Sequence, residues 1–291
     1  MAVLGYGFIG RRVARTAGSS GWSVRALARR DGAPPEAPDH DVFTGDASDP
    51  AVLDRILSGV DHVVYAAGTV KPAESDEHPL EEVAANLGPI IATLQAMERH
   101  GVPSMTFLSS AGTVYGPGAP APTPEDAPLW PISTYGVLKV AAERYINLHA
   151  HQHGFAADIL RCANVYGPGE PEVGSQGLIG ITRRALADGR PVVLFGDGGA
   201  RRDFVHVDDL AGAVERLARD PLGVRVLNVG SGRSEAVKEI VEMVAESIGV
   251  EPTFDRRPAR ATDAPLVQLD IRRIQSLIPF TPRDVREGLS Y

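Results

Sequence analysis

A tyrosine and a lysine stand four residues apart in the segment Tyr135-Gly-Val-Leu-Lys139. A helix is predicted from about Ser133 to His151, and the i,i+4 spacing places both side chains on one face of it. A cation beside a phenol stabilises tyrosinate relative to tyrosine. The pair could therefore pass a proton to or from a substrate oxygen while a hydride moves between substrate and nicotinamide. Upstream, a predicted strand ends in Ser109-Ser110, which supplies hydroxyl groups at its carboxyl end.

A glycine-rich turn near the start of the sequence has the pattern of a phosphate-binding loop. The residues Gly5-Tyr6-Gly7-Phe8-Ile9-Gly10 form G-x-G-x-x-G between a predicted strand over 2–4 and a predicted helix over 8–19. The first glycine permits a tight turn, the second lets backbone approach a pyrophosphate, and the third allows close packing of helix on strand. The helix N-terminus favours the negative charge. We therefore expect Gly5, Gly7, Phe8, Ile9 and Gly10 to bind a dinucleotide.

The residues after the second predicted strand bear on which dinucleotide is bound. An acidic side chain there binds the ribose 2′-hydroxyl of NAD, whereas an arginine accommodates the 2′-phosphate of NADP. The segment Val24-Arg-Ala-Leu-Ala-Arg29-Arg30 has no acid and ends in two arginines. We expect NADP(H) on this ground. NAD(H) is the alternative if Arg29 and Arg30 are only a solvated basic pair.

The elements that position these residues follow from an alternation of short apolar runs with longer amphipathic ones. Strands are predicted at 2–4, 22–27, 42–43, 61–66, 103–109 and 157–161. Helices are predicted at 8–19, 50–58, 79–100 and 133–151. Such alternation is typical of βαβ units and of a parallel sheet covered on both faces. The expected fold class is α/β, a doubly wound parallel sheet (Rossmann fold), which binds its ligand at the carboxyl ends of the strands.

The alternation becomes less regular after Asn164. A loop over 166–177, a helix over 178–188, a strand over 192–195 and mixed elements to the end predict a smaller mixed α/β lobe. We expect residues 1–163 to form the dinucleotide-binding domain and residues 164–291 to form mainly a substrate-binding lobe. No linker separates them, so the two parts are expected to interleave.

Composition excludes several other classes of protein. The 291 residues include 37 acidic and 29 basic side chains, giving a net charge of −8, and 43% of the residues are hydrophobic. This balance is typical of a globular protein, and the acidic excess argues against nucleic acid as a partner. No apolar run approaches the ~18 residues of a membrane span, and no export segment is expected. The single cysteine, Cys162, excludes a disulfide framework and a Cys-rich metal site. A cytoplasmic protein without a metal is expected.

Further motifs follow one another along almost the whole sequence. They are Gly45-Asp46, Tyr65-Ala-Ala-Gly68, Asn86, Ser109-Ser-Ala-Gly-Thr-Val-Tyr115-Gly, Arg161-Cys-Ala-Asn164-Val-Tyr-Gly-Pro-Gly169, Arg202-Asp-Phe-Val-His-Val-Asp-Asp209 and Asn228-Val-Gly-Ser-Gly232. With the glycine turn and Tyr135…Lys139, they make the chain resemble the extended short-chain dehydrogenases/reductases. Within that family the resemblance is to the nucleotide-sugar (NAD-dependent) epimerase/dehydratase branch, and it implies the same fold.

The resemblance implies a role for each matching residue. Tyr135 and Lys139 would bind the dinucleotide as well as act in catalysis, with Lys139 on the nicotinamide ribose. The other dinucleotide contacts would be Asp46 and Ala47 at the adenine, Ala66, Ala67 and Gly68 at the pyrophosphate and ribose, and Asn86 beside the active-site helices. Substrate binding would fall to Asn164, Gln176, Arg202 and Arg260. Both arginines would bind the diphosphate, which guanidinium groups can hold bidentately.

Departures from the family's pattern bear on the reaction. Many relatives have Ser or Thr four residues before the tyrosine of Val-Tyr-Gly, and here that residue is Ala111. We expect Ser110, or else Thr113, to bond the substrate oxygen instead. The dehydratases that resemble this chain carry Asp-Glu where it has Gly112 and Thr113, which argues against dehydration.

Two reactions fit these residues. The first is an NADP(H)-dependent ketoreductase that reduces a nucleoside-diphosphate sugar at C4, with Tyr135 as the proton donor. The alternative is an NAD-dependent 4-epimerase of the UDP-hexose type, in which the dinucleotide stays bound. We expect the ketoreductase because the acid after the second strand is missing. A non-catalytic nucleotide sensor is disfavoured by the intact Tyr135 and Lys139. The resemblance also implies a homodimer formed through helices like 79–100 and 133–151.

Overall fold

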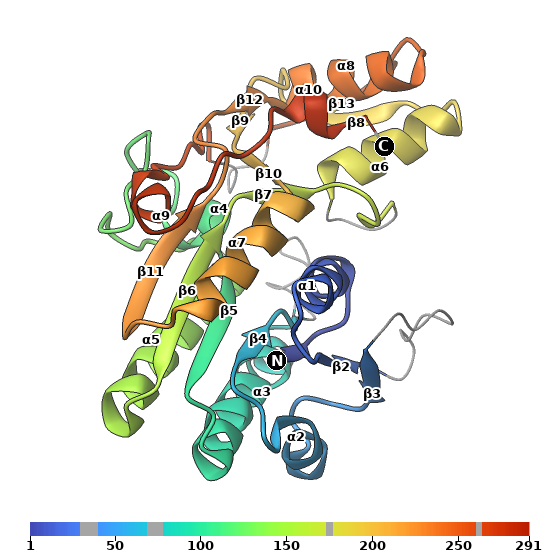
Figure 1. Cartoon of the computed structure of the whole chain (residues 1–291). Coiled ribbons are helices and arrows are strands. Elements are labelled where there is room, and N and C mark those ends of the chain that lie inside the picture. The colour runs from blue at the N-terminus through green and yellow to red at the C-terminus, as the bar shows by residue number, and fades with distance from the viewer. Residues whose placement is uncertain (30–39, 69–77, 173–176, 260–263, 291) are drawn as a thin grey trace.

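A computed structural model describes residues 1–29, 40–68, 78–172, 177–259 and 264–290. Its central sheet has seven strands in the order β11-β6-β5-β4-β1-β2-β3, and each neighbouring pair is parallel (Figure 1). The strands are β1 (Ala2–Leu4), β2 (Arg25–Ala28), β3 (Asp41–Thr44), β4 (Val63–Tyr65), β5 (Ser104–Ser110), β6 (Ala156–Cys162) and β11 (Val224–Val229). This architecture confirms the predicted doubly wound Rossmann fold.

Helices cover both faces of the sheet, so its central strands are buried on both sides. Strands β1 and β4 are apolar throughout, whereas β5 also carries buried hydroxyl residues. On one face, α1 (Phe8–Ser19) packs against α7 (Val207–Arg219). The other face carries α2 (Pro50–Leu57), α3 (Pro79–His100) and α5 (Thr134–His153), with α3 lying against α5. Local capping sets the start of α5, where the Ser133 hydroxyl accepts the Gly136 N–H at 3.2 Å.

The second strand starts three residues later than predicted, at Arg25 rather than Trp22. The Trp22 N–H donates to Ala17 O, which is the closing bond of α1, and Gly21 has a φ of +88°. Trp22 therefore belongs to the turn that ends the helix, although its apolar side chain suggested a strand.

The segment after Asn164 contributes to two parts of the molecule. Its strand β11 forms one edge of the main sheet and its helix α7 covers that sheet. Helix α9 (Arg272–Leu277) packs on β11, and its buried Ile274 belongs to the core of the main sheet. The remaining elements form the smaller lobe, with its own apolar core between α6 and α8. They are β7 (Asn164–Tyr166), α6 (Leu178–Ala187), β8 (Val192–Phe195), β9 (Arg201–Arg202), β10 (Phe204–His206), β12 (Glu235–Ala236), α8 (Val237–Ile248), β13 (Phe254–Arg257) and α10 (Val285–Gly288).

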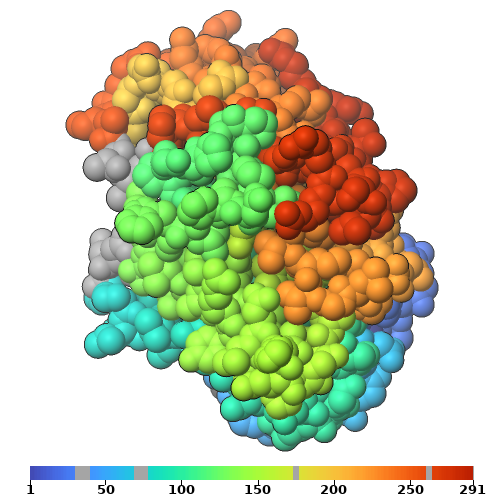
Figure 2. Space-filling view, turned by 90° about the vertical axis from the view of Figure 1, so that its left-hand side faces the viewer, coloured from blue at the N-terminus to red at the C-terminus, as the bar shows by residue number. Residues whose placement is uncertain are grey.

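The Pro/Gly-rich segment after β5 connects the two parts. It contains the short helix α4 (Ala111–Val114) and then lies against C-terminal residues, as the green and red atoms in Figure 2 show. Thr123 N–H donates to Gln268 O at 2.7 Å, and Asp270 N–H donates to Thr123 O at 2.9 Å. Residues far apart in sequence therefore form one wall of the lobe.

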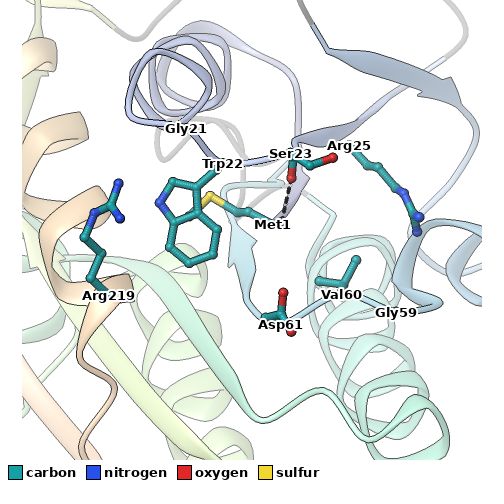
Figure 3. Close-up of a pocket in the computed structure, with 9 residues that line it drawn as sticks. All are labelled: Met1, Gly21, Trp22, Ser23, Arg25, Gly59, Val60, Asp61 and Arg219. Carbon is teal, nitrogen blue, oxygen red and sulfur yellow. Dashed lines mark hydrogen bonds between the residues drawn. The ribbon is translucent and has the colours of Figure 1, made fainter.

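A cavity of about 330 Å³ opens beside Met1, at the amino ends of β1, β2 and β4. Trp22, Arg25, Asp61 and Arg219 are among its lining residues (Figure 3). Doubly wound sheets bind their ligands at the opposite, carboxyl edge, so this cavity is not the predicted site. No helix within the described ranges is long and apolar enough to cross a membrane.

Candidate active site

The predicted dinucleotide site lies where β1 and β4 are neighbours, because the chain winds outward in opposite directions from these two strands. Gly5 follows β1 with a φ of +106°, and a Cβ added there would lie 2.4 Å from Ala67 N at the end of β4. A Cβ on Gly10 would lie 1.9 Å from Gly5 O. Only glycine allows this tight turn and this close approach of α1 to β1.

The second glycine of the turn faces open space. Among the described residues, and apart from chain neighbours, no atom lies within 4 Å of a Cβ built on Gly7 or on Gly68. Gly7 is also the N-cap residue of α1 and provides no side-chain capping bond. Backbone N–H groups at such a helix start can hold a pyrophosphate, so the turn fits the dinucleotide that its sequence predicts.

Residues beyond β2 and β3 lie at the expected adenosine end. The Asp46 carboxylate accepts the hydroxyl and the N–H of Ser48, both at 2.7 Å, and these bonds lower the pKa of Asp46. Ala47 packs, partly buried, against the core on the α3 side of the sheet. Arg29 is exposed at the end of β2, and Arg30 lies outside the described residues.

The predicted catalytic pair lies in one small cavity. Tyr135, Lys139, Asn86 and Ala67 line it together with Phe107 and others. Lys139 Nζ donates to Leu108 O at 2.8 Å and lies 4.9 Å from the Phe107 ring centroid. The same nitrogen is 5.6 Å from the Tyr135 ring centroid. The ammonium is therefore held beside the phenol at the carboxyl edge of the sheet.

Asn86 reaches this cavity from α3. Its amide Nδ2 donates to the carbonyl oxygen of Glu82 at 3.0 Å and to its carboxylate at 2.9 Å. These two bonds hold the Asn86 side chain against α3, on the side of that helix that faces the cavity with Tyr135 and Lys139.

The two serines at the end of β5 face different environments. Ser109 is buried, and its hydroxyl donates to Glu143 at 2.5 Å. Ser110 is half-buried and precedes α4 without capping it. Thr113 donates its hydroxyl to Ser110 O at 3.3 Å. The tertiary structure therefore commits Ser109 to the interior, and the prediction that Ser110, or else Thr113, bonds the substrate oxygen stays a prediction.

The predicted substrate residues are only partly within the described ranges, since Gln176 and Arg260 lie outside them. Asn164 Nδ2 donates to Asp203 O at 3.0 Å, and the neighbouring Arg202 donates to Ala264 O at 2.6 Å. Asn164 and Arg202 are thus adjacent in the lobe, as a shared diphosphate contact requires.

Asp203 anchors this part of the lobe. Its buried carboxylate accepts the Ser231 N–H at 2.7 Å, the Ser231 hydroxyl at 2.9 Å, and the N–H groups of Gly232 and Leu269. Burial raises the pKa of Asp203 to about 6, although the four donors oppose that shift. The lobe also reaches the phosphate-binding turn, because a Cβ on Gly169 would lie 3.9 Å from the Phe8 ring.

Two residues beside the catalytic pair were not predicted from the sequence. Phe107 places its ring under the Lys139 ammonium, which a buried strand sequence does not reveal. Glu143 is buried on the same face of α5. Its spacing of four residues from Lys139 could have been noticed, but charged residues at that spacing usually face solvent.

Known proteins that are similar to this chain are nucleotide-sugar enzymes, in agreement with the geometry of the site. Residues 1–230 match the NAD dependent epimerase/dehydratase family. A UDP-glucose 4-epimerase of Azospirillum brasilense is 32% identical over 99% of this chain and 90% of its own. A dTDP-4-dehydro-6-deoxyglucose reductase of Escherichia coli is 29% identical over 76% of this chain and 69% of its own.

Solved structures of relatives superpose on nearly the whole chain. The UDP-glucose 4-epimerase of Thermotoga maritima, determined with UDP-glucose, has a TM-score of 0.92 at 28% identity, covering 100% of this chain and 96% of its own. The UDP-glucose 4-epimerase of Thermus thermophilus, determined with NAD, has a TM-score of 0.89 at 28% identity, covering 100% and 97%.

Fold and site together define a Rossmann-fold enzyme of the short-chain dehydrogenase/reductase type. More particularly, the chain belongs to the NAD dependent epimerase/dehydratase family.

Proposed function

We propose that this enzyme is an NAD-dependent 4-epimerase acting on a UDP-linked hexose. The observation that carries the proposal is the cavity shared by Tyr135, Lys139 and Asn86 beside an open glycine turn. The 4-epimerases similar to this chain over nearly its full length support the choice of reaction.

The proposed chemistry uses side chains that the fold already holds in place. Bound NAD⁺ would accept a hydride from C4 of the hexose and return it to the other face. Tyr135 would take the proton from the C4 hydroxyl and give it back, with the Lys139 ammonium 5.6 Å from its ring centroid. Ser110, or else Thr113, would hydrogen-bond the same oxygen and keep it aligned with the phenol.

The choice of NAD revises the expectation of NADP(H), which rested on Arg29 and Arg30. Within the described residues Arg29 is exposed at the end of β2, and Arg30 lies outside them, so the described part of the chain does not support that expectation. A structure of a similar 4-epimerase contains NAD, which supports the alternative.

An NADP(H)-dependent ketoreductase is the second candidate. It is favoured by the exposed Arg29 at the end of β2, where the sequence has no acid for a ribose hydroxyl. The similarity to a reductase over three-quarters of the chain is consistent with it. Both candidates need the same Tyr135 and Lys139, so only the fate of the dinucleotide separates them.

The test is to identify the dinucleotide and then to follow its consumption. Purified protein is denatured, the released dinucleotide is identified, and stripped protein is titrated with NADH and NADPH. Retained NAD⁺, with interconversion of UDP-glucose and UDP-galactose and no added dinucleotide consumed, is the result expected. An empty site that prefers NADPH, with stoichiometric oxidation during turnover of a 4-keto sugar nucleotide, would replace the epimerase by the reductase.

A homodimer in the cytoplasm is part of the same proposal. Helices α3 and α5 carry exposed apolar side chains on the outside of the sheet: Leu80, Val83, Val137, Tyr145 and Leu148. An apolar surface of this kind is typical of a helical subunit interface. Sedimentation equilibrium should give twice the chain mass, and Leu148→Glu should shift the protein toward monomer. A wild-type monomer at micromolar concentration would contradict this part.

A further inference from the structure

A buried ion pair lies one helical turn beyond the catalytic lysine. Glu143 and Arg161 are 2% and 5% exposed, and Arg161 donates to the Glu143 carboxylate through Nη2 at 2.8 Å and Nε at 3.1 Å. Burying two charges is costly unless geometry and additional hydrogen bonds compensate. The side chains of Ser109 and Tyr115 and the backbone carbonyl of Glu125 supply those bonds here.

On one side, the pair connects α5 with the end of β5. The Ser109 hydroxyl donates to Glu143 Oε1 at 2.5 Å, and Lys139 Nζ donates to Leu108 O at 2.8 Å. Two successive residues of the strand are thereby bonded to two successive turns of the catalytic helix. Ser110, which we propose for the substrate oxygen, comes directly after them.

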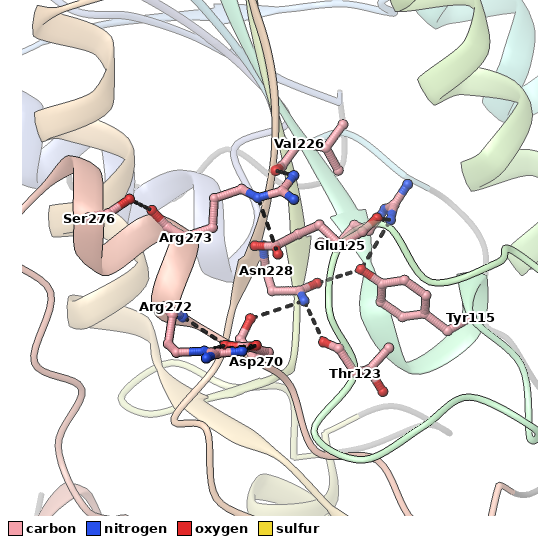
Figure 4. Close-up of polar contacts among 10 residues, drawn as sticks. Tyr115, Thr123, Glu125, Val226, Asn228, Asp270, Arg272, Arg273 and Ser276 are labelled. Carbon is pink, nitrogen blue, oxygen red and sulfur yellow. Dashed lines mark hydrogen bonds and ion pairs between the residues drawn. The ribbon is translucent and has the colours of Figure 1, made fainter.

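On the other side, the pair is linked to β11 and, through it, to the Pro/Gly-rich segment that connects the two parts of the molecule. Arg161 Nη1 donates to the Tyr115 hydroxyl at 3.0 Å. That hydroxyl donates to Asn228 Oδ1 of β11 at 2.7 Å (Figure 4). Asn228 in turn donates from its backbone N–H to Glu125 at 2.9 Å and from Nδ2 to Thr123 O at 2.8 Å. Tyr115 also ends the α4 turn that begins after Ser110.

We infer that Glu143 and Arg161 are positioning residues, which set the distance between Ser110 on β5 and Tyr135 on α5. This inference rests on the proposed function, because it assumes that these two side chains share one substrate oxygen. The hydrogen bonds described for the ion pair go instead to Ser109, Tyr115 and the Glu125 carbonyl. The pair acts through Ser109 on the strand side and through the α5 backbone on the helix side.

The physical reason is the precision that proton transfer requires. A displacement of about 1 Å at reacting groups can lower a rate ~10²-fold. The Ser110–Thr113 turn is short, and the side-chain hydrogen bond described within it is the one from Thr113 to Ser110 O at 3.3 Å. A charge-assisted bond from the residue before Ser110 to the catalytic helix restrains the turn more than a neutral bond does.

Ser109→Ala tests this inference because it removes one hydroxyl and leaves the Glu143–Arg161 pair in place. Ser104→Ala is the matched control. Ser104 is on the same strand, is also buried, and bonds through its hydroxyl to His62 at 2.8 Å and to Asp61 O at 3.0 Å, at the opposite end. Both variants lose buried hydroxyl bonds, so a purely structural effect should be similar in both.

Two readouts are measured on the full chain with its dinucleotide. The first is kcat and KM for the best UDP-hexose substrate, normalised to bound dinucleotide. We expect Ser109→Ala to lower kcat about 10-fold with KM within about twofold, and Ser104→Ala to keep kcat within about twofold. The second readout is hydrogen exchange of the amides over 111–115, which should be faster only in Ser109→Ala.

Each outcome decides the matter. Equal effects of the two variants on kcat and on exchange would overturn the positioning role. If the wild type converts no nucleotide sugar, the proposed function fails. The exchange readout then decides the positioning role alone: faster exchange confined to Ser109→Ala supports it, and unchanged exchange overturns it.

Discussion

Gly10→Ala should mainly lower the stability of the fold, whereas Gly7→Ala should mainly weaken dinucleotide binding, although both glycines belong to the same turn. At Gly10 the added Cβ would meet Gly5 O at 1.9 Å, whereas contacts under 3.0 Å essentially never occur. Helix α1 must then move away from β1 by about 1 Å in a close-packed core. At Gly7 the added Cβ meets no atom within 4 Å in the part of the chain that the structure describes, apart from its chain neighbours.

The magnitudes follow from these contacts. Overpacking costs ~1–3 kcal/mol, and the severity of this contact places Gly10→Ala near the upper end. Replacing a helical glycine by alanine also stabilises the helix by ~1 kcal/mol, which offsets part of this loss. The net loss in free energy of unfolding is about 2 kcal/mol, or a fall in Tm of roughly 4–8 °C. Gly7→Ala changes only an N-cap residue with a φ of −89° and should cost less than about 1 kcal/mol.

The assay is urea unfolding without dinucleotide, combined with a titration of NADH by fluorescence. Gly7→Ala should raise the Kd for NADH at least ~10-fold, which is 1.4 kcal/mol, because its methyl group occupies the space left for the pyrophosphate. The reasoning fails if Gly10→Ala is as stable as the wild type, or if Gly7→Ala binds NADH normally.

Three further predictions concern single side chains. Tyr135→Phe should lower kcat by ~10²–10⁴ with little change in dinucleotide binding, and near wild-type turnover would exclude Tyr135 as the proton carrier. Burial lowers the pKa of His62 to about 3, so its neutral form stabilises the fold above pH 6.5 and that stability is lost on acidification. Between pH 6.5 and 5 the wild type should lose about 2 kcal/mol that His62→Gln does not lose, as measured by urea unfolding. Burial raises the pKa of Glu170 to about 7, and its contribution to stability is therefore lost as pH rises from 4.5 through 7. Glu170→Gln should gain stability relative to the wild type at pH 8 but not at pH 4, and an equal change at both would refute this account of Glu170.

Much of the fold and part of the site could be predicted without coordinates, because they depend on local rules. The helix predicted over 79–100 is α3 with the same bounds, since Pro79 can begin a helix and Gly101 ends it in the left-handed region. The glycine turn and the Tyr135/Lys139 spacing are likewise local patterns, and the fold places each beside the carboxyl edge of the sheet.

The rest was decided by contacts between distant segments. The sequence placed two hydroxyls at the end of the strand and favoured Ser110, or else Thr113, for the substrate oxygen. Only the packing of α5 on β5 made Ser109 a partner of Glu143. Likewise β11 looked like part of the small lobe, yet pairing with β6 places it in the main sheet. Residue patterns report which side chains are apolar or charged. They do not report which buried surfaces meet, and that is what brings Glu143, Arg161 and Tyr115 together beside the catalytic pair.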